Sequence, residues 1–114
     1  MRRTLSYALL TGVATLCLAL PAPASAVDGK EVFLAQKCDT CHSVSTAGIA
    51  ATTKSEKMKG PDLVGVVQAH ESTWVKDFVS KKVDKDGKKH AKEFKGTEEE
   101  LAALVDWLAA QKKS

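Results

Sequence analysis

Two cysteines and a histidine stand close together in the segment QKCDTCH, residues 36–42 of this 114-residue chain. A Cys-x-x-Cys pair serves three chemistries in proteins: redox dithiols, zinc sites and covalent attachment of haem. Only haem attachment requires a histidine directly after the second cysteine. Cys38, Cys41 and His42 are therefore the residues whose chemistry the rest of the chain has to support.

The two other chemistries lack the surroundings that they need. A thioredoxin-like dithiol follows a strand, and no strand pattern precedes Cys38. A zinc site takes four ligands, but the remaining histidines, His70 and His90, lack the tight spacing of a second ligand pair. The sequence therefore predicts that Cys38 and Cys41 each add to a vinyl group of one haem, with His42 as the proximal iron ligand.

The first 26 residues have the pattern of an export signal. Arg2 and Arg3 precede an apolar stretch over residues 5–20, and residues 24–26 end the segment with the small-x-small pattern Ala-Ser-Ala. The apolar stretch is short for a membrane span, so we expect cleavage after residue 26 and no membrane anchor. The predicted organisation is a cleaved signal peptide (1–26) and a periplasmic monohaem domain (27–114).

The charge of the mature domain is nearly balanced. Residues 27–114 carry 15 basic and 14 acidic side chains, a net charge of +1, which gives no support for nucleic-acid binding. The exception is the segment 81–95, with seven lysines against three acids. It is a candidate docking surface for transient, acidic redox partners, or else a solvated loop. We expect a monomer.

Three helices are predicted from caps and apolar spacing. Asp28 is expected to cap a short helix that runs into Cys38, and Ser72 to cap a second one. Thr97 begins the last helix with the capping box TEEE. The second helix has one apolar face, and the last an apolar stripe: Trp74, Val75, Phe78 and Val79, then Leu101, Leu104, Val105 and Leu108.

Two long connections, residues 43–59 and 80–96, separate these helices. There is no strand alternation, internal repeat or sign of a second domain. The predicted fold is a small all-α domain of three to four helices, with long loops wrapped around one haem.

Residues 28–114 resemble a class I monohaem c-type cytochrome. The resemblance rests on three segments: GKEVFLAQKCDTCH, GPDLVGV and GTEEELAALVDWLAAQ. It implies one haem c, bound through the two cysteines, and a crossing of the first and last helices that places Phe33 against Leu104 and Trp107. It also implies that the Pro61 carbonyl accepts the Nδ1 hydrogen of the proximal histidine, a bond that would fix the ring's tautomer. An ordinary turn proline is the alternative.

The sixth iron ligand is where the sequence departs from that family. Most members have a methionine shortly before the last helix, but residues 88–94 read KKHAKEF. His90 stands at the methionine's place and is the predicted ligand, with Phe94 packed beside the ring. Met58, near the proximal proline, and His70, expected to be an exposed polar residue, are alternatives. A solvent-facing His90 would leave the sixth site open.

The ligand set decides the expected function. Two histidines predict a one-electron carrier of low potential for its class, and no enzyme activity, because a second imidazole favours ferric iron and leaves no site for a substrate. A haem-based ligand-binding or sensing module, or a small peroxidase, is the alternative with an open sixth site. A haem subunit held in a larger enzyme through the lysine-rich loop is a third.

Overall fold

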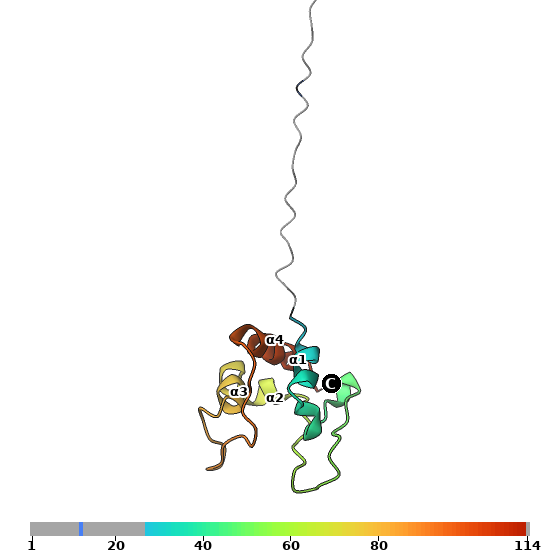
Figure 1. Cartoon of the computed structure of the whole chain (residues 1–114), viewed down its shortest axis with the longest axis vertical. Coiled ribbons are helices and arrows are strands. Elements are labelled where there is room, and N and C mark those ends of the chain that lie inside the picture. Colours follow the sequence, from blue (N-terminus) through green and yellow to red (C-terminus); the bar gives the residue numbers. More distant parts are fainter. Residues whose placement is uncertain (1–11, 13–26, 114) are drawn as a thin grey trace, which may run out of the picture.

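Four α-helices and two 3₁₀-helices form the fold in the computed structural model, which describes Gly12 and residues 27–113 (Figure 1). Among these residues the only β-structure is a pair of isolated bridges. The predicted all-α fold is therefore confirmed, whereas the predicted signal peptide lies, except for Gly12, outside the described residues. In chain order the helices are α1 (Gly29–Ala35), η1 (Cys38–Thr40), η2 (Ser45–Ala47), α2 (Val66–His70), α3 (Ser72–Val79) and α4 (Glu98–Ala109).

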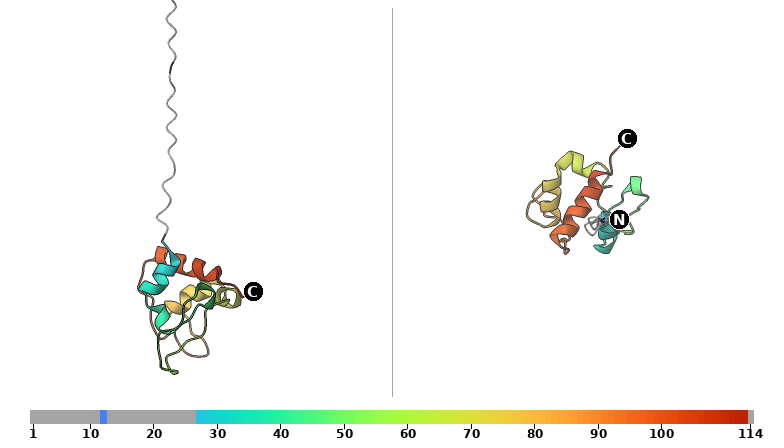
Figure 2. Two further views of the ribbon diagram at one scale, coloured as in Figure 1. Left: turned by 90° about the vertical axis from the view of Figure 1, so that its right-hand side faces the viewer. Right: turned by 90° about the horizontal axis from the view of Figure 1, so that it is seen from above.

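The first and last helices, α1 and α4, cross in close contact (Figure 2). A Cβ at Gly29 would lie 2.2 Å from the Ala103 carbonyl oxygen and 2.3 Å from the Cβ of Trp107, so only glycine fits at the crossing. One turn later, the Phe33 and Trp107 rings pack with centroids 5.4 Å apart and planes tilted by 50°. The expected contact of Phe33 with the Trp107 face is confirmed.

The predicted N-caps of α1 and α4 are both present. The Asp28 side chain accepts a hydrogen bond from the Lys30 backbone N–H, at 2.9 Å. At α4, the Thr97 hydroxyl accepts from the Glu100 N–H at 3.1 Å, and the Glu100 carboxylate accepts from the Thr97 N–H at 2.9 Å. This reciprocal pair satisfies backbone donors that a helix start otherwise leaves unpaired. The predicted stripe of α4 is buried: Leu101, Leu104, Val105 and Leu108.

Two predicted boundaries were wrong. Helix α1 ends at Ala35, because Lys37 takes a left-handed conformation (φ 59°) and the chain then turns into η1 before reaching the second cysteine. Ser72 is the first residue of α3 and not its cap; Glu71, with φ 67°, holds the cap position without a side-chain hydrogen bond. The positive φ at Glu71 separates α3 from α2.

Helix α2 was not predicted. It has five residues, begins with two β-branched valines and follows Gly65, so local propensity is weak. Its support comes from packing, since Val67 is buried, and from the Gln68 side-chain amide, which donates to the Ala109 carbonyl at 2.9 Å. No helix within the described residues is long and apolar enough to cross a membrane.

The buried core lies between the helices, and the long loops extend from its far side. Figures 1 and 2 show residues 48–65 and 80–97 together on the side opposite α4. The core therefore has α4 on one side and the two loops on the other. Its buried apolar residues are Val32, Phe33, Val44, Val64, Val67, Val75, Leu101, Leu104, Val105 and Leu108.

Candidate functional site

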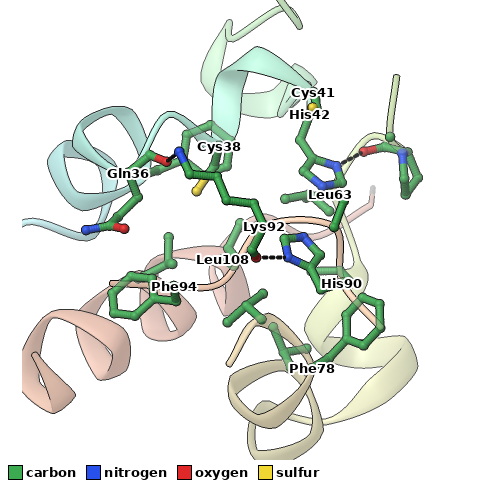
Figure 3. A pocket seen from close by; sticks show the side chains of 18 of the residues that line it. Gln36, Cys38, Cys41, His42, Leu63, Phe78, His90, Lys92, Phe94 and Leu108 are labelled. Carbon is green, nitrogen blue, oxygen red and sulfur yellow. Dashed lines mark hydrogen bonds between the residues drawn. The ribbon is translucent and has the colours of Figure 1, made fainter. Parts of the chain in front are cut away.

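A cavity of about 380 Å³ opens between the helices and the two long loops (Figure 3). This volume falls in the range of small-molecule and cofactor pockets, which are mostly apolar with a few polar groups. All the residues predicted to bind a cofactor line it: Cys38, Cys41, His42, Pro61, His90 and Phe94. Its apolar wall includes Phe33, Leu63, Val66, Trp74, Val75, Phe78, Val79, Leu104 and Leu108.

The two cysteines come from the η1 turn. The Cys41 and His42 backbone N–H groups both donate to the Cys38 carbonyl, at 3.2 and 2.9 Å, so the turn holds the motif together. Both thiols are free and half-buried. Burial raises the pKa of the Cys38 thiol to about 11, while the nearby Lys92 ammonium acts in the opposite direction. The Cys38 thiol is therefore protonated at neutral pH.

His42 is oriented by a backbone carbonyl. Its Nδ1 lies 2.8 Å from the Pro61 oxygen. A carbonyl oxygen only accepts hydrogen bonds, so Nδ1 carries the hydrogen and Nε2 keeps a free lone pair. Burial lowers the pKa of His42, as does the nearby His90, and the bond to Pro61 opposes this shift. A neutral imidazole with a free Nε2 is the form that binds a metal ion.

The Gly60-Pro61 segment is tied directly to the cysteine motif. The Gly60 N–H donates to the Cys41 carbonyl at 2.8 Å, and the Leu63 N–H donates to the Ser43 carbonyl at 2.9 Å. Between these bonds, Gly60 packs against the His42 ring: a Cβ there would lie 2.3 Å from Cε1 and 2.6 Å from Nδ1. Sequence reasoning missed this role of Gly60, although the Gly-Pro pair was itself a signal of a special backbone position.

His90 faces His42 across the cavity (Figure 3). The two ring centroids are 6.1 Å apart and the ring planes differ by 10°. His90 Nδ1 is hydrogen-bonded to the Lys92 carbonyl, which again leaves Nε2 free. Metal–imidazole bonds are about 2 Å long and the bonded nitrogen lies roughly 1 Å from its ring centre, so two imidazoles on opposite sides of one ion would have centres roughly 6 Å apart.

The other candidate ligands line the same cavity. Met58 is 56% exposed. The expectation that His70 is exposed was wrong: it is half-buried and stacks on Trp74, with centroids 4.5 Å apart. Trp74 stacks on Phe78 at 4.8 Å, and Phe78 meets the His90 ring edge-on at 5.3 Å. The spacing of His70, Trp74 and Phe78, four residues each, was the sequence signal that could have placed His70 here.

Comparison with known protein families shows to which family the chain belongs. Residues 26–112 match the family model named Cytochrome c, over most of the chain. The chain belongs to the cytochrome c family. With its Cys-x-x-Cys-His motif it is a class I c-type cytochrome. No significant match to this cytochrome was found among the curated proteins or the solved structures.

Cytochromes c are haem-based electron carriers that hold haem c covalently, and the cavity of this cytochrome fits that group. Two free thiols and a histidine with a free Nε2 stand at one side of an apolar pocket. Phe94 lines the pocket and is fixed there, because its N–H donates to the Val79 carbonyl at 2.8 Å and its ring packs on Gly96. Cys38 and Cys41 would hold the haem, and His42 would bind its iron.

Proposed function

We propose that this cytochrome is a periplasmic one-electron carrier in which His42 and His90 bind the haem iron from opposite sides, and that its potential is low for its class. The main support is the arrangement of the two rings, nearly parallel with centroids 6.1 Å apart. Each Nδ1 is engaged by a carbonyl, from Pro61 and Lys92 respectively. Such partners of a ligating histidine fix its tautomer and raise its basicity.

Two properties of the cavity favour electron exchange: both histidine rings are already oriented, and the surrounding side chains are mostly apolar. Haem supplies the Fe(III)/Fe(II) couple when bound. His42 and His90 are each oriented by a hydrogen bond to a backbone carbonyl in the protein alone. Phe78 meets the His90 ring edge-on, and apolar side chains form most of the cavity wall around it. A second imidazole stabilises the ferric state more than a thioether does, which lowers the potential.

Export is supported by the sequence of residues 1–26, with its basic start, apolar stretch and small-x-small end. Two imidazoles also leave no coordination site for a substrate, which favours carrier duty over catalysis. An open sixth site, with ligand sensing or peroxidase chemistry, is the outcome that would replace this proposal.

One preparation tests these points together. The holoprotein is purified from the periplasmic fraction, weighed intact and studied by low-temperature electron paramagnetic resonance in the fully oxidised state. We expect the mass of residues 27–114 plus one haem, and a low-spin spectrum of two imidazole ligands. A high-spin spectrum would show an open site, and a histidine–methionine spectrum would assign Met58. Retention of residues 1–26 would contradict the proposed processing.

We also propose that the lysine-rich loop, residues 81–95, docks acidic redox partners. Lys85, Lys89 and Lys92 are exposed and line the cavity's edge. Lysines placed there would steer a negatively charged partner toward the site from which the electron leaves.

Replacing Lys85 and Lys89 with Gln is expected to slow oxidation by a small anionic complex several-fold at low salt, with little effect at high salt, where charges are screened. Stopped-flow rates measure this effect. The matched control replaces Lys112 and Lys113, two exposed lysines that do not line the cavity, with Gln. An equal slowing in that control would show that net charge, and not the loop, is responsible.

A further inference from the structure

The loop that carries His90, residues 80–97, is anchored unevenly. At its start, the Lys81 and Lys82 N–H groups donate to the Phe78 and Asp77 carbonyls, at 3.1 and 2.8 Å. The loop then turns on itself, with Lys85 and Lys88 paired by two backbone hydrogen bonds. Between residues 83 and 89, the described structure has no hydrogen bond from this first half of the loop to a helix. The firm anchors of His90 must therefore lie after it.

The second half of the loop is bound to the end of α1 through Gln36. The Lys92 ammonium donates to the Gln36 backbone carbonyl at 2.9 Å, and the Lys95 N–H donates to the Gln36 side-chain oxygen at 3.1 Å. Figure 3 shows the Lys92 side chain reaching across from the neighbourhood of His90 to Gln36. One residue of α1's C-terminal end thus accepts two hydrogen bonds from a loop more than fifty residues later in the chain.

Gln36 lies at the end of a helix that packs firmly in the core, so it can anchor the loop. It holds the C-cap position of α1, where a helix leaves carbonyl groups without partners and where a cation is favoured. Helix α1 is in turn locked against α4 at Gly29. Two residues after Gln36 comes Cys38, so the same segment also leads into the haem attachment motif.

Lys92 connects this anchor to the His90 ring. Its backbone carbonyl is the partner of His90 Nδ1, while its ammonium binds Gln36. We propose that Gln36 and Lys92 form a latch that positions His90 opposite His42, with Gln36 acting as a positioning residue for the distal ligand. This inference rests on the His42/His90 ligation proposed above.

The latch sets how often the distal ligand leaves the iron. A ligand carried by a loop exchanges between bound and unbound positions, and any contact made only in the bound arrangement shifts that equilibrium. Loss of one intramolecular hydrogen bond changes such a population by roughly 2- to 10-fold. Carbon monoxide binds ferrous haem only when the sixth position is free, so its association rate reports the unbound population.

Four variants of the holoprotein test the latch. Gln36→Ala removes the side-chain acceptor for the Lys95 N–H but keeps the backbone carbonyl that binds Lys92, so Lys92→Met removes the ammonium in a separate variant. Gln36→Glu keeps a side-chain oxygen at position 36, and Gln68→Ala removes a glutamine hydrogen bond of similar length between α2 and α4. We expect Gln36→Ala and Lys92→Met each to speed carbon monoxide association by roughly 2- to 10-fold, and Gln36→Ala also to speed amide hydrogen exchange at Lys95. Gln36→Glu should restore both rates, and Gln68→Ala should leave them unchanged.

Two results would overturn the latch. One is an unchanged carbon monoxide rate in both Gln36→Ala and Lys92→Met, and the other is an equal rise in Gln68→Ala, which would mean a general loosening of the fold. In either case a low-spin bis-imidazole spectrum of the unaltered protein leaves the proposed function intact. A high-spin spectrum of the unaltered protein would instead remove His90 as a ligand, and the latch with it.

Discussion

Replacing His90 with Ala is expected to convert the ferric cytochrome from low-spin to high-spin and to let the ferrous form bind carbon monoxide readily. His90 is the residue whose ring lies 6.1 Å from that of His42 with nearly parallel planes, and its removal takes away the donor on that side. The reduction potential should rise, because ferric iron loses its second imidazole. Electron paramagnetic resonance, a carbon monoxide titration and a redox titration measure the three effects.

His70→Ala is the matched control for this experiment. His70 lines the same cavity and stacks on Trp74, but it stands at the other end of the aromatic row from the His90 ring. We expect His70→Ala to remain low-spin and to bind carbon monoxide as slowly as the unaltered protein. A low-spin spectrum that survives His90→Ala, or that disappears in His70→Ala, would show that the distal ligand has been assigned to the wrong residue.

The second large effect is expected from Gly60→Ala on the proximal side. The added methyl group would lie 2.3, 2.6 and 3.1 Å from Cε1, Nδ1 and Nε2 of His42, so the ring or the backbone has to move. Overpacking of this kind typically costs about 1–3 kcal/mol of stability. Displacement of the ring would also weaken its hydrogen bond to Pro61. Urea denaturation and the ferric spin state of the holoprotein measure the two consequences.

Gly48→Ala is the control for Gly60→Ala, because it introduces backbone strain without a steric contact. Gly48 has φ +69°, so alanine there is strained, but the added Cβ would have no atom within 4 Å beyond residues 47–49. Its cost should be about 1 kcal/mol, from conformation alone, and the haem spectrum should not change. If Gly60→Ala behaved like Gly48→Ala in both measurements, the proposed packing of Gly60 on the His42 ring would be wrong.

The parts of the fold that local rules determine were predictable from the sequence. The Asp28 cap, the Thr97 capping box and the buried stripe of α4 each depend on residues within a few positions of one another. The Pro61 carbonyl was assigned through the family resemblance, and the hydrogen bond to His42 is present. The ligand roles of His42 and His90 remain predictions.

The features that were missed depend on contacts between distant segments. Helix α2 is too short and valine-rich to be recognised by propensity, and it depends on packing against α4. Gly60 touches a ring 18 positions earlier in the chain, and Gln36 binds a loop beyond residue 90. No spacing rule connects such pairs, so their roles became visible only in three dimensions.

Some side chains belong both to the buried core and to the wall of the cavity, which links the stability of the fold to the group that occupies the cavity. Phe33, Val75, Leu104 and Leu108 are buried core residues that also line the cavity, so whatever fills the cavity contributes to the stability of the folded chain. A ligand bound reversibly gives less stabilisation as its concentration falls. A group joined through both Cys38 and Cys41 cannot be lost by dilution, so its contribution to stability does not depend on the supply of free haem.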